Sequence, residues 1–246
     1  NDEPLSISKA SEVEGYVNVV ARILTSKPGV IVKRDGSGQI DVVRGSLADP
    51  SGSIGFLSWV PFEHQEGSLV KIVGASVRKF RDTPEINISD GTVIEPYHDT
   101  AFPDMSELAA SSKSTIADLR NGMRDVEVTL QVESWNQRTF DGEDGSQRVV
   151  RSGDVIDPSG RCRLTAWCEF DPKPGDFIHI EGGRVQFWQG SPDLVIDQIE
   201  QVIDLSDPPW KKIDPEGHWI DLDLTDIVNG GSRRGIKTLG TVVAVR

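Results

Sequence analysis

The four residues Asp49-Pro50-Ser51-Gly52 occur a second time in this chain as Asp157-Pro158-Ser159-Gly160, 108 residues later. The same offset carries Trp59 onto Trp167. Further pairs follow in this register, without a gap, from about residue 42 to residue 94: Phe62 with Phe170, Gly67 with Gly175, Gly74 with Gly182, Val77 with Val185, Phe80 with Trp188, Pro84 with Pro192 and Ile88 with Ile196. Chance does not easily place so many matches in one register, so the chain contains a duplicated unit.

Each copy of the repeat alternates apolar and polar residues, which is the pattern of β-strands. The predicted strands are Tyr16–Leu24, Ile40–Leu47, Ile54–Trp59, Leu69–Val77 and Glu85–Ile94 in the first copy, and Val126–Trp135, Arg148–Ile156, Cys162–Trp167, Phe177–Val185 and Asp193–Ile203 in the second. Five strands in ~90 residues, without a long helical period between them, indicate a small closed barrel. The predicted fold class is all-β, with tandem five-stranded barrels and a short helix at Met105–Ser111.

A third copy begins near the end of the sequence. Asp118–Gly122 is echoed by Asp226–Gly230, and Ile236–Ala244 has the pattern of a first strand. We therefore predict four parts: a first barrel over 1–98, a linker over 99–115, a second barrel over 116–205, and an acidic linker with the start of a third, truncated barrel over 206–246.

The order of these motifs resembles the tandem OB-folds of the replication protein A family, most closely its archaeal single-chain members. The stretches that carry the resemblance are Gly45–Gly52, Phe56–Trp59 and Gly74–Phe80, with Leu164–Trp167 and Gly182–Trp188 in the second copy. One departure is the space between the third and fourth strands. Family members usually place a helix there, whereas Val60–Glu66 and Cys168–Pro174 are long enough only for a turn.

The resemblance implies a non-enzymatic protein that binds single-stranded DNA in replication, recombination and repair, with two base-stacking aromatics per barrel. Those positions are Trp59 and Phe80 in the first copy, and Trp167 and Trp188 in the second. Strand alternation supports this independently, because Trp167 and Arg163 share the face of their strand opposite to the small apolar residues Cys162, Leu164 and Ala166. Stacking a base on an exposed aromatic contributes roughly 1–3 kcal/mol and tolerates any sequence. The alternative is that these rings pack against a loop or a neighbouring domain.

Basic residues near these aromatics are candidates for phosphate contacts. By resemblance, Arg138 and Phe140 form an Arg-x-aromatic motif that wraps the strand. Arg78, Lys79 and Arg81 flank Phe80. The further candidates, each of which could instead be an ordinary solvated charge, are Lys33, Arg34, Arg44, Arg151, Arg163 and Arg184.

The formal net charge of −13 argues at first against a polyanionic partner. The acidity is localised, however. Residues 193–226 hold ten acids against two lysines, residues 95–118 five against one lysine, and residues 1–14 four against one lysine. The net charges are −8, −4 and −3, which leaves +2 for the rest of the chain. The predicted DNA-binding grooves, which carry the exposed tryptophans, therefore remain available to a polyanion.

Other functions find little support in the sequence. Cys162 and Cys168 are expected to be buried thiols rather than a disulfide or half of a metal site. The four histidines are scattered, and no catalytic triad, P-loop or dinucleotide-binding motif is present, so no metal, cofactor or small-molecule substrate is predicted. No apolar run approaches the ~18–20 residues of a membrane helix, and no signal peptide is visible. We expect an intracellular protein, in the cytoplasm or nucleoid, or in the nucleus of a eukaryote. Two alternatives stay open: an RNA-binding OB-fold protein, and a scaffold that binds peptides or another subunit.

Overall fold

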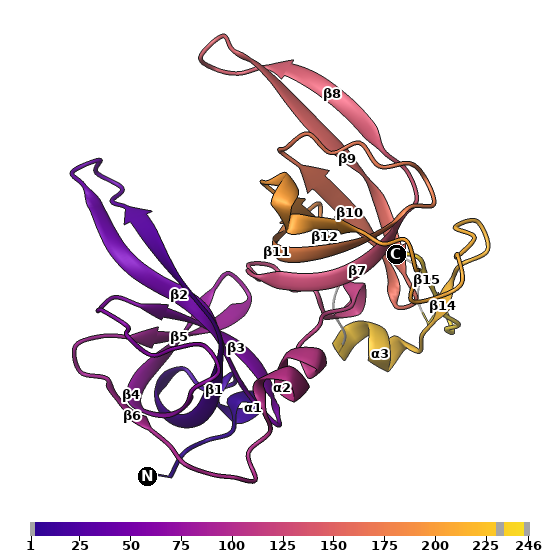
Figure 1. Cartoon of the computed structure of the whole chain (residues 1–246). Helices are drawn as coiled ribbons and strands as arrows, with labels where there is room; N and C mark the ends of the chain where they lie inside the picture. Colours follow the sequence, from indigo (N-terminus) through magenta and orange to yellow (C-terminus); the bar gives the residue numbers. More distant parts are fainter. Residues whose placement is uncertain (1–2, 230–233, 244–246) are drawn as a thin grey trace. The chain divides into compact units, whose positions relative to one another are not determined.

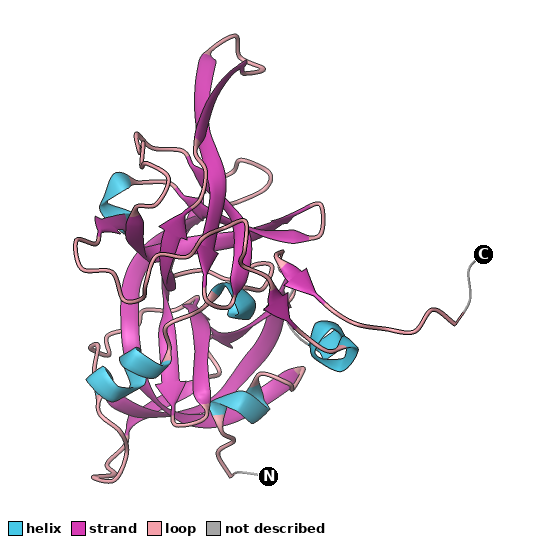
Figure 2. Ribbon diagram, turned by 90° about the vertical axis from the view of Figure 1, so that its right-hand side faces the viewer, coloured by secondary structure: helices cyan, strands magenta, loops and turns pink. Residues whose placement is uncertain are grey.

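Strands dominate both halves of the chain, and the helices are short (Figure 2). The structure is a computed structural model that describes residues 3–229 and 234–243. It divides into two units, Asn1–Lys113 and Ser114–Arg246.

The first unit is a closed barrel of five strands with a sixth strand added (Figure 1). Its strands are β1 (Gly15–Val32), β2 (Gln39–Asp49), β3 (Gly52–Ser58), β4 (Leu69–Phe80), β5 (Thr83–Ile88) and β6 (Val93–Pro96). The order is β1-β2-β3-β5-β4, and β4 pairs back with β1. Only β3 and β5 run parallel, whereas the other pairs are antiparallel. β6 pairs with Val70–Val73 of β4, a stretch that does not pair with β5.

The second unit repeats this architecture. Its strands are β7 (Val126–Val132), β8 (Asn136–Asp141), β9 (Gln147–Asp157), β10 (Gly160–Ala166), β11 (Phe177–Trp188), β12 (Ser191–Ile196) and β13 (Val202–Asp204). The barrel closes in the order β7-β9-β10-β12-β11, with β8 added to β9 and β13 added to β11. The predicted all-β class with tandem five-stranded OB-fold barrels is confirmed.

The repeated Asp-Pro-Ser-Gly stretch forms the turn between the second and third strands and also holds the base of each barrel. Asp49 is buried, and its carboxylate accepts hydrogen bonds from the N–H of Ser51 at 2.7 Å and of Ile7 at 2.8 Å. Asp157 does the same with Ser159 at 2.7 Å and Ile116 at 2.8 Å. Ile7 opens α1 (Ile7–Ala10) and Ile116 opens the short 3-10 helix η1 (Ile116–Asp118). The turn that identifies the repeat is thus also the anchor for the segment beneath each barrel.

Two equivalent glycines let the chain cross itself closely. A Cβ on Gly45 would lie 1.9 Å from the carbonyl oxygen of Thr25, and a Cβ on Gly153 would lie 1.8 Å from that of Ser134. Only glycine allows this approach of one backbone to another, so both positions are fixed by sterics.

The extents of several strands differ from the prediction. β1 continues eight residues past Leu24 and β8 was not predicted, because these segments form hairpin arms without the alternating burial that marks a barrel strand. The last strand of each copy is divided into two, β5 with β6 and β12 with β13, by the turn near Asp90 and by the 3-10 helix η2 (Ile199–Gln201). The helix α2 forms at Met105–Ser111 as predicted, with a capping box between Asp104 and Glu107. No helix lies between the third and fourth strands of either barrel in the described residues, so the prediction of only a turn in each space is confirmed.

The segments predicted as linkers pack on the barrels. Arg22 on β1 donates to the carbonyl oxygen of Pro103 at 2.9 Å, and its guanidinium lies 5.7 Å from the ring centre of Phe102. Leu108 of α2 is buried against Leu24 and Ala48. In the second unit the amide of Gln131 makes two 2.8 Å hydrogen bonds with the backbone of Ile213. Residues after 98 and after 205 therefore contact the barrel that precedes them.

The start of the third copy contains little strand. After β14 (Ile220–Asp221) and α3 (Leu224–Asn229), the strand predicted over Ile236–Ala244 is present only as β15 (Ile236–Lys237), which pairs in parallel with β14. Residues 238–243 are irregular, and both Gly230 and Ala244 lie outside the described part of the chain.

Candidate nucleic-acid interface

The two tryptophans singled out by the repeat lie at the same point of each barrel. Trp59 directly follows β3 and Trp167 directly follows β10, and each backbone N–H donates at 3.0 Å to the last residue of the neighbouring strand, Ile88 or Ile196. The side chains are 41% and 45% exposed. The backbone is thus fixed while much of each ring faces solvent.

The alternation predicted for β10 is confirmed, and it separates core from surface. Cys162, Leu164 and Ala166 belong to the barrel core, whereas Thr165 does not, although it is buried. Leu57 of β3 is the equivalent residue and is also buried outside the core cluster. An outward side chain is therefore not always a solvated one, since both residues are buried.

The second predicted aromatic of each barrel lies at the hairpin between the last two barrel strands. Phe80 ends β4 and is 43% exposed, and Trp188 ends β11 and is 57% exposed. Phe187, which precedes Trp188, packs against the core of the second barrel. Arg81 places its guanidinium carbon 5.4 Å from the centre of the Phe80 ring, as a cation–π contact.

A buried carboxylate organises the outer face of the second barrel. Asp193 of β12 accepts hydrogen bonds from Thr165 Oγ1 at 2.8 Å and from Gln186 Nε2 at 3.0 Å, and lies 3.9 Å from the guanidinium of Arg163. Arg163 also donates to Ser152 at 3.1 Å. Sequence reasoning did not single out Asp193. The available signal was its match at the same offset to Glu85, which lies 3.9 Å from Arg44 in the first barrel.

The β8–β9 hairpin places one predicted residue, Phe140, beside Trp167. The rings of Phe140 and Trp167 lie 6.2 Å apart and are nearly perpendicular, at 77°. Such edge-to-face geometry is favourable between aromatics. Arg138 lies two residues before Phe140 on β8 and therefore shares its face. Its side chain is exposed and has no hydrogen-bond or ion-pair partner among the described residues.

Trp59 has no aromatic ring contact of this kind in the described residues and is held differently. Its indole N–H donates to Asn87 Oδ1 at 3.1 Å. The equivalent of Asn87 in the second barrel is Val195, which cannot accept a hydrogen bond. The two copies thus orient the same tryptophan by different means.

The other predicted basic residues fall into two groups. Arg151, Arg184 and Lys79 pair with carboxylates: Arg151 with Asp171 at 3.2 Å, Arg184 with Asp197 at 2.9 and 3.1 Å, and Lys79 with Glu14 at 3.9 Å. The bonds to Asp197 raise the pKa of Arg184. Arg78 on β4 and the pair Lys33 and Arg34 in the β1–β2 turn have exposed side chains, and these make no ion pair within the described residues.

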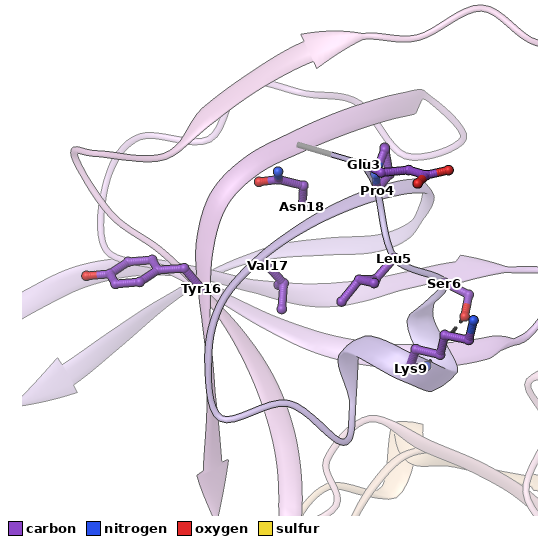
Figure 3. Close-up of a pocket in the computed structure, with 8 residues that line it drawn as sticks. All are labelled: Glu3, Pro4, Leu5, Ser6, Lys9, Tyr16, Val17 and Asn18. Atoms are coloured by element: carbon purple, nitrogen blue, oxygen red, sulfur yellow. Dashed lines mark hydrogen bonds between the residues drawn. The ribbon is translucent and has the colours of Figure 1, made fainter. Parts of the chain in front are cut away.

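Features that would indicate a different kind of site are few in the described residues. Cys162 and Cys168 are free thiols; Cys162 is buried as predicted, whereas the prediction is wrong for Cys168, which is only partly buried. The one described group of side chains that could hold a metal ion is Glu127, His179 and Glu181, and His179 is already hydrogen-bonded to Thr129 at 2.8 Å and Glu127 at 3.1 Å. A pocket of about 590 Å³ is lined by Glu3–Ser6, Lys9 and Tyr16–Asn18 (Figure 3). None of the predicted binding residues lines it, and Tyr16 points away from the other lining side chains.

Within the residues that the structure describes, no helix is both long and apolar enough to span a membrane.

A comparison with curated proteins finds Replication factor A of Methanothermobacter thermautotrophicus, which is 29% identical over 202 residues. The match covers 75% of this chain and 25% of that protein, so the chain spans about a quarter of the length of this relative. The predicted resemblance to the replication protein A family is confirmed at the level of sequence similarity. No family model matches the chain.

Among solved structures, fission yeast Pot1 with single-stranded DNA is 14% identical, with a TM-score of 0.46 over 84% of this chain and 90% of that one. A replication protein A heterotrimer bound to single-stranded DNA is 16% identical, with a TM-score of 0.36 over 84% of this chain and 52% of that one. A murine protein bound to duplex DNA is 11% identical, with a TM-score of 0.45 over 76% of this chain and 97% of that one.

Proposed function

We propose that this chain binds single-stranded DNA with little dependence on base sequence, by stacking bases on the exposed aromatics of both barrels and pairing phosphates with arginine and lysine. The observation that carries the proposal is the repetition of one exposed pair. Trp59 with Phe80, and Trp167 with Trp188, occupy equivalent strand ends and are 41% to 57% exposed. Aromatic rings kept in water at the same two points of both copies favour a ligand that covers them.

The surroundings of these rings suit a strand of bases and phosphates. Asn87 and Phe140 orient the two tryptophans, which lowers the entropy lost when a base stacks. Arg138 and Arg78 have exposed side chains near the aromatic positions and are available to phosphates. Arg81 already stacks on Phe80, and a guanidinium plane can stack on a base as well.

Other predicted basic residues contribute less in this proposal. Arg151, Arg163 and Arg184 each lie near a carboxylate, so a phosphate must compete with Asp171, Asp193 or Asp197. The number of phosphates neutralised is then small, and so is the expected dependence of affinity on salt.

The two barrels are covalently joined, so a strand held by one meets the other at a raised effective concentration. We extend the proposal to the boundaries 1–98, 99–115, 116–205 and 206–246, to action in replication, recombination and repair inside the cell, and to assembly with further subunits. The similarity to Replication factor A supports this extension. Stacking and ion pairing need no catalytic group, cofactor or small-molecule substrate, so we propose a binding protein rather than an enzyme.

Titration of the chain with oligo-dT, oligo-rU and a duplex, followed by tryptophan fluorescence, tests the proposal. Oligo-dT is expected to quench the fluorescence strongly, since stacking couples the base to the indole. The duplex is expected to bind weakly, because its bases are not free to stack. Equal affinity for oligo-rU would favour an RNA-binding protein instead. No quenching by any of the three at low salt would overturn the proposal and favour a scaffold for peptides or another subunit.

A further inference from the structure

Residues 205–229 and 234–237, here called the C-terminal strap, are attached to the outside of the second barrel. In Figure 1 the strap, in orange to yellow, runs beside the lower end of that barrel. The N–H of Leu205 donates to the carbonyl oxygen of Phe177 at 2.9 Å, and the ring of Trp210 lies 5.5 Å from that of Phe177. The double hydrogen bond between Gln131 and Ile213 and a 3.1 Å contact from His218 Nε2 to Asp157 O follow along the strap.

The strap covers part of the face that carries Trp167. Arg161, Arg163 and Trp167 alternate on the outer side of β10 and the residue after it, so they share one face. Arg161 donates to the carbonyl oxygen of Pro215 in the strap at 2.5 Å. Ile156, which pairs with Arg161, is 0% exposed although it lies outside the barrel core cluster. The strap therefore covers this face at Arg161, whereas the face is exposed at Trp167.

Arg234 marks the edge of the closed part. Its N–H and C=O form an isolated antiparallel bridge with Arg161, with hydrogen bonds of 3.0 and 3.2 Å. The opposite edge of β10 pairs with β9, and the guanidinium of Arg234 pairs with Asp154 of β9. The side chain must therefore cross the outer face of β10. Asp154 is the partner of Arg163 in the β9–β10 register, so the crossing lies directly beside Arg163.

The strap also carries net negative charge. Residues 205–229 contain six acids against two lysines, a net charge of −4, and Arg234 and Lys237 bring the whole strap to −2. Asp214 and Glu216 flank Pro215, the residue that contacts Arg161. A phosphate backbone that approached this end of the face would meet both a closed surface and negative charge.

The second groove is here the outer face of the second barrel that carries Trp167 and Trp188. We propose that the C-terminal strap forms an end-wall of this groove: it blocks and repels single-stranded DNA at Arg161, and so confines the bound strand to the part of the face from Arg163 to Trp188. This inference rests on the proposed function. It also gives the acidic segment a role at the site itself, as a limit on the strand that the barrel can hold.

The first test removes charge and keeps shape. Asp214→Asn/Glu216→Gln is expected to raise the affinity for oligo-dT about threefold at low salt, and the gain should vanish near 0.5 M salt, because the repulsion is screened. Glu12→Gln/Glu181→Gln is the matched control, since it removes the same charge at positions outside both aromatic grooves. It is expected to leave the affinity nearly unchanged.

The second test locates the strand. Hydrogen exchange of wild type is expected to show protection at the residues around Trp167 and Trp188 on adding oligo-dT, and no change in the strap around 210–218. Arg234→Ala is expected to open the wall and to lengthen the shortest oligo-dT that gives full affinity. Equal affinities for the charge variant and its control, or new protection of the strap on binding, would overturn the end-wall. Failure of wild type to bind oligo-dT would overturn the proposed function itself, which is a separate result.

Discussion

The equivalent tryptophans of the two barrels, Trp59 and Trp167, are oriented by different contacts. A tryptophan that stacks bases must present a ring face and keep its orientation. Trp59 is oriented by a hydrogen bond to Asn87 at 3.1 Å, and Trp167 by the edge of Phe140 at 6.2 Å. The second arrangement leaves the indole N–H of Trp167 without the amide that Trp59 uses, and it adds Phe140 to the proposed stacking surface.

Phe140→Ala is expected to weaken the binding of oligo-dT by about three- to tenfold, because it removes one aromatic surface and frees the Trp167 ring. The measurement is a fluorescence titration. Asn136→Ala, at the other end of β8, is the control and should leave affinity nearly unchanged. An unchanged affinity of Phe140→Ala would remove Phe140 from the interface.

The cysteines give a test of the barrel interior. Burial raises the pKa of the Cys162 thiol, and also that of Cys168. A raised pKa means less thiolate at a given pH, so both thiols should react with iodoacetamide more slowly than free cysteine at pH 8, and Cys162 the more slowly. In denaturant both should react at the ordinary rate. Alkylation of Cys162 in the folded protein at the rate of a free thiol would contradict its burial.

Elements of the fold depend on a few close approaches. Gly45 and Gly153 let a neighbouring backbone pass within the space of a methyl group. Gly45→Ala is expected to destabilise the first barrel by about 2–3 kcal/mol, because backbone atoms must move. Gly55→Ala on the adjacent strand is the control: its Cβ would meet nothing closer than 3.8 Å, and the free energy of unfolding should change by less than about 1 kcal/mol. Chemical denaturation measures both, and similar losses would contradict the steric explanation.

The β8–β9 hairpin is proposed to act as an electrostatic arm. Arg138→Ala should weaken oligo-dT binding most at low salt and reduce the slope of log affinity against log salt by about 0.7, the value for one phosphate of a single strand. Glu143→Gln, in the turn of the same hairpin, controls for a general change in charge. A loss of affinity without a change in slope would mean that Arg138 acts by packing and not on a phosphate.

The elements also show what the sequence could and could not predict. Barrel strands were predictable because burial on one face imposes alternation, as in Cys162–Trp167. β8 was missed because both of its faces are exposed, and exposed strands carry no such signal. Asp193 was missed because a single acid in an apolar strand does not reveal its partners, which come from β10 and β11. The anchoring of Ile213 to Gln131 joins residues 82 positions apart, and no local pattern encodes it.

At the scale of the whole molecule, the duplication explains both the architecture and the charge. Two barrels carry equivalent exposed aromatics, and the acidic segments after each barrel are packed against it rather than free. A net charge of −13 is compatible with a polyanionic ligand because the negative charge is concentrated outside the rings that would stack bases. The central claim about the molecule is that Trp59 and Trp167 form the centre of the proposed interface.

The most direct test of that claim compares wild type with Trp59→Ala, Trp167→Ala and the double variant, by fluorescence anisotropy of a labelled oligo-dT at fixed salt. If both barrels bind one strand, as proposed, the double variant is expected to bind far more weakly than either single variant, while circular dichroism shows that all four proteins remain folded. A folded double variant that binds oligo-dT as tightly as wild type would contradict the account.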